Sequence, residues 1–313
     1  MAKIIRKIIP VILTFTIILL CNARQPDKEG YTSRPDDVLR NLLPEMPEGL
    51  TEPSQRAAYL VLHYWDKYDF NDTAFLMTND LLERSFVDFL DIASLVPGDT
   101  LDKSVSLLMK KAEEERTVFL FLSKLSEQYL YNPESPVYDE EKLIPFLRQE
   151  IKSPLLSDTE KIRPGFLLEN VMKNRTGYTA NDFTYTLKDE KTGTLHAICA
   201  DYVLLYFNDP TCEDCHMLTR RLIVSPIING FIKRGKLKIL TVYTNDDMDA
   251  WEKYASSVLN SWIYSRDAGQ KINAEGIYNI KRFPTIYLLD KDKKVLLKDT
   301  VFEKLEDYFS KQQ

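Results

Sequence analysis

The chain has 313 residues, more than one ordinary globular core needs, so we expect two domains. Hydrophobic residues make up 44% and charged residues 28%, which excludes a disordered, collagen-like or multi-span membrane protein. The net charge of −6 leaves no excess of Lys and Arg to neutralise a phosphate backbone, so no nucleic-acid partner is expected.

The amino terminus has the pattern of a secretory signal peptide over residues 1–20. Three basic residues precede an apolar run from Ile8 to Leu20, which is too short to span a bilayer as a permanent helix. The pattern predicts an exported protein of the periplasm or cell envelope.

Cys21 directly follows Ile18-Leu19-Leu20, a sequence that resembles the lipobox of bacterial lipoproteins. The resemblance implies lipidation of Cys21 and a lipid anchor in the membrane. Leu20 departs from the small residue that this family prefers before the cysteine, so ordinary cleavage after Ala23 stays open as the alternative. Residues 21–34 are polar and contain proline and glycine, which predicts a tether.

Apolar residues recur at helical spacing over residues 35–176, which predicts an all-helical domain of five or six helices. Helix starts are predicted near Thr51, Asn79, Asp139 and Ser157. One long or broken helix is predicted between Leu101 and Tyr129. This domain has a single histidine, His63, and no cysteine, so neither a metal site nor an active site is expected in it.

Short β-rich runs alternate with helical segments over residues 177–313, which predicts an α/β domain with one sheet. Strands are predicted at Asp182–Leu187 and Leu195–Ile198, as a hairpin, and at Tyr202–Phe207, Leu237–Tyr243, Thr285–Leu289 and Val295–Lys298. Helices are predicted near 214–233, 247–258, 270–277 and 302–311.

Two cysteines, Cys212 and Cys215, form a C-x-x-C motif between the predicted strand Tyr202–Phe207 and a helix. Free N–H groups and the positive end of the helix dipole stabilise a thiolate on the first cysteine. The second lies within one turn, where its sulfur can attack a mixed disulfide. The motif therefore predicts a redox-active pair, with a structural disulfide as the alternative.

This arrangement resembles the thioredoxin fold, and more particularly the exported thiol–disulfide oxidoreductases of the TlpA/ResA type, over about residues 177–313. The supporting motifs are Ala180-x-Asp182-Phe183, the strand before Cys212, and Phe283-Pro284-Thr285. The resemblance implies that Pro284 is a cis proline facing the cysteine pair and that the backbone of Phe283 docks an extended substrate. Thr211 and Thr285 are the other predicted substrate contacts.

Departures from the family leave the proton acceptor of Cys215 unassigned. The buried carboxylate that many thioredoxins carry six positions before the first cysteine is Tyr206 here. The weak candidates for this role are Glu213, Asp209 and His216, the last expected to face solvent. Cys199 is expected to be a small buried hydrophobe, with a third redox thiol as the alternative.

The whole chain also resembles a group of Bacteroides-type envelope proteins in which a helical domain of unknown function precedes a thioredoxin-like one. The segments Tyr64–Phe70 and Tyr129–Pro133 carry this resemblance. We therefore predict an exported thiol–disulfide oxidoreductase that acts on protein disulfides or thiols, receives electrons from a membrane thiol donor and uses no cofactor and no metal. The alternative is a binding or scaffolding lipoprotein built on a thioredoxin-like platform.

Overall fold

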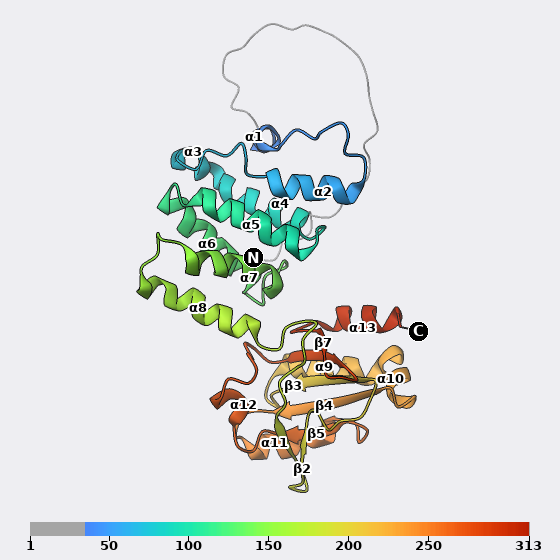
Figure 1. Ribbon diagram of the computed structural model, residues 1–313. Coiled ribbons are helices and arrows are strands. Elements are labelled where there is room, and N and C mark those ends of the chain that lie inside the picture. The colour runs from blue at the N-terminus through green and yellow to red at the C-terminus, as the bar shows by residue number, and fades with distance from the viewer. Residues whose placement is uncertain (1–34, 313) are drawn as a thin grey trace, which may run out of the picture.

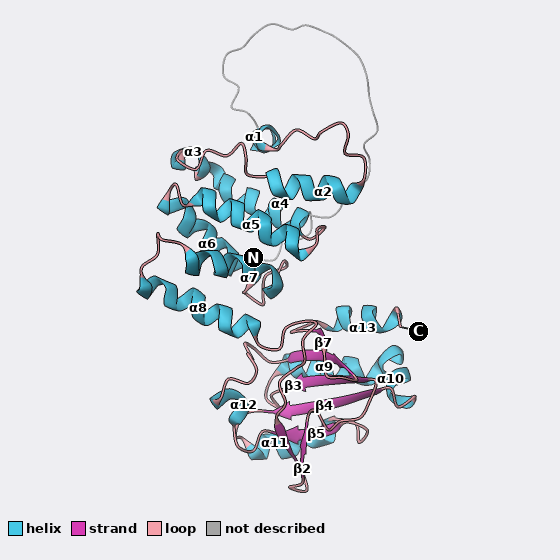
Figure 2. Cartoon of the chain, viewed as in Figure 1, coloured by secondary structure: helices cyan, strands magenta, loops and turns pink. Residues whose placement is uncertain are grey.

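The computed structural model describes residues 35–312, in which helices come first and a sheet with helices follows (Figure 1, Figure 2). We refer to residues 35–176 as the helical domain and to residues 177–312 as the sheet domain. The α-helices of the first are α1 (Pro35–Leu42), α2 (Pro53–His63), α3 (Thr73–Leu76), α4 (Leu81–Ala93), α5 (Gly98–Ala112), α6 (Arg116–Leu130), α7 (Glu140–Lys152) and α8 (Asp158–Met172), with a 3-10 turn at η1 (Thr78–Asp80).

The described part of the helical domain thus holds eight α-helices, more than the five or six predicted. Part of the difference is that α3 has only four residues, too few for a periodic pattern. The segment between Leu101 and Tyr129 is broken in two, because the Glu115 side chain accepts from the backbone N–H of Thr117 and caps a new helix. The predicted starts at Asp139 and Ser157 are confirmed, and Ser157 forms a capping box with Glu160.

One apolar core holds the helical domain together. It includes the aromatic run near the end of α2, where the Tyr64, Trp65 and Tyr68 rings are at most 4% exposed. The three rings contact one another, and those of Tyr64 and Trp65 also contact the ring of Phe89 in α4. Within the described residues, no helix is both long and apolar enough to cross a bilayer.

The sheet domain has one mixed sheet, with strand order β2-β1-β5-β4-β3-β6-β7 in the described residues. The strands are β1 (Thr184–Leu187), β2 (Thr192–Thr194), β3 (Tyr202–Phe207), β4 (Leu237–Tyr243), β5 (Ile263–Arg266), β6 (Thr285–Asp290) and β7 (Val295–Leu297). Its helices are α9 (Glu213–Val224), α10 (Pro226–Lys233), α11 (Met248–Tyr254), α12 (Lys271–Ala274) and α13 (Phe302–Ser310), with a 3-10 turn at η2 (Ala255–Ser257).

Strand β3 is buried on both faces, as its continuous apolar run predicts. It pairs in parallel with β4 and antiparallel with β6. Leu204 and Tyr206 pack in one apolar cluster with α9, α10 and α13, whereas Val203 and Leu205 pack in a second cluster on the opposite face. Both faces of the sheet are therefore covered, and the end of β3 leads directly into the loop before α9.

One strand prediction was wrong, and one strand was missed. The hairpin partner of β1 is Thr192–Thr194 and not Leu195–Ile198, which turns back through hydrogen bonds to Thr194 and Leu195 carbonyls. Gly193 fits the strand because a side chain there would meet the Tyr185 ring.

Strand β5 was not predicted at all. The single helix expected at 214–233 is two helices, α9 and α10, separated at Ser225, which caps α10.

Figure 1 shows the helical domain stacked against the end of the sheet domain that carries β7 and α13. Strand β7 lies at the edge of the sheet, where its backbone pairs with residues 177–180 that follow the helical domain. The expected order of an all-α domain followed by an α/β domain with one sheet is confirmed.

Candidate functional site

Cys212 is the last residue before α9 and caps this helix. Its sulfur accepts a hydrogen bond from the backbone N–H of Cys215 at 3.2 Å. On its other side the thiol donates to the carbonyl of Phe283 at 3.5 Å. The side chain is half-buried, so an incoming sulfur has access to it. A helix amino terminus favours negative charge at this position.

The loop before β6 reaches this sulfur from the opposite side. The Phe283–Pro284 peptide bond is cis, as the resemblance implies. Thr285 pairs with Phe207 at the end of β3, and its hydroxyl donates to the Arg282 carbonyl at 2.7 Å. The structure therefore brings Cys212, Phe283 and Pro284 to one end of the central strands.

Thr211 also lies at this end of the sheet. It is exposed, and both its backbone N–H and its hydroxyl donate to Asp209 Oδ1, at 2.7 and 2.6 Å. The other carboxylate oxygen of Asp209 accepts from Asn245 at 2.7 Å. These bonds fix the loop between β3 and α9. Both hydrogen-bond donors of Thr211 are used within the loop, so a substrate can contact only its other exposed atoms.

Cys215 is fully buried beneath Cys212. Burial raises the pKa of its thiol well above the usual range, whereas hydrogen bonding from the backbone of Asp209 and from the Tyr206 hydroxyl lowers the pKa. The two cysteines therefore differ in the way that exchange requires, with an accessible first sulfur and a second sulfur shielded until a mixed disulfide forms.

A chain of three buried hydroxyls lies under the cysteine pair. The Tyr206 hydroxyl donates to the Cys215 carbonyl at 2.9 Å and lies 3.2 Å from the Thr219 hydroxyl, which lies 2.7 Å from the Tyr254 hydroxyl. Because each hydroxyl carries one proton, Thr219 must donate to Tyr206, and Tyr254 must donate to Thr219. All donors point toward Cys215, in the place where many thioredoxins carry a carboxylate.

The three predicted proton acceptors lie elsewhere. Glu213 is exposed and pairs with Arg220 at 3.2 Å, while the Asp209 carboxylate is occupied by Thr211 and Asn245. His216 is half-buried rather than fully exposed, and its Nε2 lies 2.9 Å from the Pro210 carbonyl. Sequence reasoning noted Tyr206 only as a departure from the family, and its position six residues before Cys212 was the available signal.

A cavity of about 500 Å³ opens next to Pro210 and His216, near the cysteine pair. Its opposite wall is formed by α11 with its N-cap residue Asp247, and carries Lys253 and Tyr254. No group of three or more His, Cys, Asp or Glu side chains suited to a metal ion occurs in residues 35–312.

The other two cysteines are not part of this arrangement. Cys199 is exposed, so the prediction that it is a buried hydrophobe was wrong; it lies in the turn after β2 and not in a strand. Cys21, the predicted lipidation site, lies outside the described residues, as do the predicted signal peptide and tether.

Comparisons with known proteins cover both domains. A family model described as a domain of unknown function (DUF5106) matches residues 21–174. The crystal structure of a thioredoxin-like protein from Bacteroides caccae is 38% identical, with a TM-score of 0.83, over 87% of this chain and 98% of that chain.

Two further structures each match less than half of this chain. The C-terminal domain of an uncharacterised Bacteroides fragilis protein is 40% identical, over 44% of this chain and 98% of its own, with a TM-score of 0.43. The thioredoxin domain of a thiol-disulfide oxidoreductase from Bacteroides vulgatus is 23% identical, over 44% of this chain and 97% of its own, with a TM-score of 0.38. No curated protein matches the sequence.

Proposed function

Because the chain belongs to the same thioredoxin-like family as the Bacteroides caccae protein, we propose that it is an exported thiol–disulfide oxidoreductase acting on protein disulfides. One observation carries this proposal. The Cys212 sulfur caps a helix, accepts from the N–H of Cys215 at 3.2 Å and lies 3.5 Å from the Phe283 carbonyl beside Pro284. A structural disulfide has no need of an accessible sulfur at this position.

The reaction proceeds in two exchanges. The Cys212 thiolate attacks one sulfur of the substrate disulfide, so a Cys212–substrate bond forms, the substrate S–S bond breaks and the leaving thiolate takes up a proton. Cys215 then loses its proton and attacks the Cys212 sulfur. This step forms the Cys212–Cys215 disulfide and releases the second substrate thiol, so two electrons pass from the cysteine pair to the substrate.

The oxidised pair needs an external dithiol to return it to the reduced state. We propose that this donor is a membrane thiol protein, and that a lipid anchor on Cys21 keeps the enzyme near it in the cell envelope. The lipobox-like sequence before Cys21 supports the anchor.

Extended substrates are proposed to dock on the backbone at Phe283. This carbonyl lies directly before Pro284, at the start of β6, and points at the Cys212 thiol. A peptide strand that pairs with this segment would bring its disulfide over the Cys212 sulfur, since main-chain pairing places alternate side chains at fixed distances. Thr285 is buried and supports the loop through its bond to the Arg282 carbonyl.

The test is reduction of insulin by the mature protein with dithiothreitol as electron donor. The wild type is expected to accelerate precipitation of the reduced insulin chain, and Cys212→Ser is expected to abolish the acceleration. Equal rates for the two proteins would overturn the enzymatic function and favour the scaffolding alternative. Cys199→Ser serves as a matched control, because it also removes one accessible thiol but lies outside the cysteine pair.

A further inference from the structure

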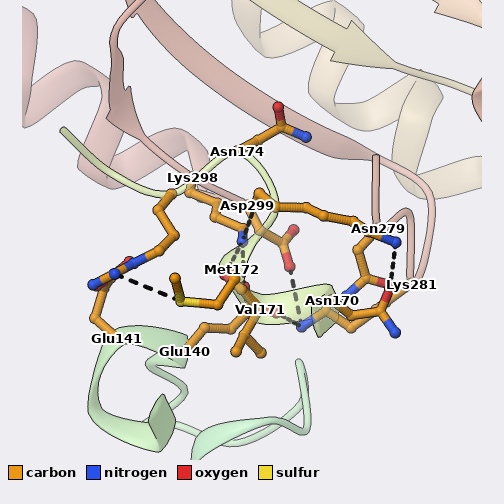
Figure 3. A network of polar contacts seen from close by, with 12 residues as sticks. Glu140, Glu141, Asn170, Val171, Met172, Asn174, Asn279, Lys281, Lys298 and Asp299 are labelled. Carbon is orange, nitrogen blue, oxygen red and sulfur yellow. Dashed lines mark hydrogen bonds and ion pairs between the residues drawn. The ribbon is translucent and has the colours of Figure 1, made fainter. Parts of the chain in front are cut away.

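A cluster of buried charges joins the two domains. Glu140, the first residue of α7, has its carboxylate oxygens 2.6 Å from Lys281 Nζ and 2.8 Å from Lys298 Nζ. Figure 3 shows Glu140 of the helical domain converging with Lys281, Lys298 and Asp299 of the sheet domain. These four charged side chains are between 5% and 11% exposed, a burial that such residues tolerate only when paired.

Hydroxyl and carbonyl groups complete the cluster. The Lys281 ammonium donates to the Tyr138 hydroxyl at 2.6 Å, which in turn donates to Asp299 at 2.8 Å. Lys298 donates to the carbonyls of Val171 and Lys173 at the end of α8, at 2.9 and 2.7 Å. We call Tyr138, Glu140, Lys281, Lys298 and Asp299 the interdomain clasp.

The clasp reaches the loop that bears on the redox pair. Lys281 lies two residues before Phe283, whose carbonyl contacts the Cys212 thiol at 3.5 Å. Lys281 also lies over the ring of Tyr131, with its nitrogen 4.3 Å from the ring centroid. Figure 1 shows the same neighbourhood, where the end of the sheet domain meets α7 and α8.

Residues on either side of Lys281 make similar contacts. Asn279 donates to the Tyr131 hydroxyl at 3.3 Å, and Arg282 pairs with Glu134 at 3.2 Å. The segment from 279 to 282 is therefore held by the connection between α6 and α7, and not by the sheet domain alone. A loop whose carbonyl must sit within reach of a sulfur depends on such fixed contacts.

Burial of these charges is not explained by stability. Replacing a buried ion pair with apolar residues of similar volume is often neutral or stabilising, so the pair by itself adds little to folding. A carboxylate paired with two lysines instead fixes geometry. When the contact opens, each group is left as a buried charge without a counter-charge, which is unfavourable. The geometry that the clasp fixes is that of the loop before Pro284.

We propose that the helical domain positions the substrate-docking loop of the redox site, with Glu140 and Lys281 as positioning residues. This inference rests on the proposed function and gives the helical domain a role in it. A protein substrate must dock an extended segment on Phe283 to react with Cys212, whereas a small disulfide needs access only to the Cys212 sulfur. Opening the clasp is therefore expected to impair the two kinds of substrate unequally.

The experiment compares two substrates in the full mature chain. Glu140→Gln removes the charge that both lysines contact. Tyr138→Phe removes only a hydroxyl and keeps side-chain volume and charge, so it serves as the second variant if Glu140→Gln folds poorly. Glu150→Gln is the matched control, since it is the same substitution at another buried position of α7 without a contact to residues 279–284. Circular dichroism verifies the fold of each variant.

Steady-state rates are measured with insulin and with oxidised glutathione. Glu140→Gln and Tyr138→Phe are expected to raise the KM for insulin at least fivefold, with kcat for insulin and both constants for glutathione within twofold of the wild type. Glu150→Gln should match the wild type on both substrates.

Three results would overturn the inference. An unchanged insulin KM in folded Glu140→Gln and Tyr138→Phe removes the positioning role, and equal losses on both substrates show a general structural role. A wild type inactive on both substrates refutes the proposed function itself, and the inference with it.

Discussion

Replacing Tyr206 with phenylalanine tests how the buried cysteine is deprotonated. The substitution keeps the ring in the core of β3 and deletes the hydroxyl that donates to the Cys215 carbonyl at 2.9 Å. It also removes the acceptor of the buried Thr219 hydroxyl. Because Tyr206 touches Cys215 and not Cys212, we expect the second exchange to slow while the first is unaffected.

The size of the effect follows from these contacts. A hydrogen bond to a charged group contributes about 1.5–3 kcal/mol, and about 1.4 kcal/mol is a factor of ten in an equilibrium. The hydroxyl donates its one proton to the carbonyl and acts on the nearby sulfur through its dipole, so at most the lower end applies and the Cys215 thiolate should fall by up to about tenfold. Thr219 keeps its bond to the Tyr254 hydroxyl, but the Cys215 carbonyl loses a donor, so the free energy of unfolding should fall by about 1 kcal/mol.

The assay follows one turnover with a fluorescent disulfide peptide in a stopped-flow instrument. The burst from Cys212 attack should match the wild type, and release of the second peptide should slow by up to about tenfold. The rate of this release should rise with pH over a higher pH range than in the wild type. Tyr254→Phe is the matched control, because it deletes the outer hydroxyl of the chain and leaves Tyr206 in place. A variant with normal release and an unchanged pH profile, but lower stability, would refute the reasoning.

Two further predictions concern other parts of the chain. Burial, together with the nearby Glu127 carboxylate, raises the pKa of Glu150 from 4.5 to about 7. The folded protein therefore keeps a proton that the unfolded chain releases, and its stability should fall between about pH 4.5 and pH 7. In urea unfolding, Glu150→Gln should gain about 3 kcal/mol at pH 8 and nothing at pH 4; equal gains at both would contradict the assignment. Cys21→Ala should move the protein from the membrane fraction to the soluble one, and a soluble wild type would favour cleavage after Ala23.

The central strand and the position of the C-x-x-C motif at its end could be predicted because local sequence determines them. The run Tyr202–Phe207 is apolar throughout, and the structure gives β3 these same bounds. A strand buried on both faces needs such a run, and the C-x-x-C follows it directly. Ser157 and Glu160 likewise carry their capping signal within four residues.

Strand β5 could not be found in this way, because contacts with the neighbouring strand stabilise it and its own sequence has no strand pattern. Ser265 is fully buried in it and donates to the Thr241 carbonyl of β4 at 2.7 Å. A polar residue at a buried position breaks the apolar pattern that predicts a strand. The exposed position of Cys199 was missed for a similar reason, since the strand expected to bury it is a turn.

The interdomain clasp lies beyond any local pattern. Glu140 and Lys281 are far apart in the chain, and each reads as an ordinary surface charge in its own segment. Their contact depends on the stacking of two domains, which the sequence of neither one specifies. The same holds for the hydroxyl chain, in which Tyr206, Thr219 and Tyr254 come from three separate elements.

The central claim is that Cys212 is the sulfur that meets the substrate. It is tested most directly by trapping with Cys215→Ser, which cannot resolve a mixed disulfide. After incubation with a protein disulfide and digestion, mass spectrometry should find the substrate peptide joined to Cys212, and the adduct should disappear in Cys212→Ser/Cys215→Ser. An adduct on the exposed Cys199 instead, or no adduct at all, would contradict the account.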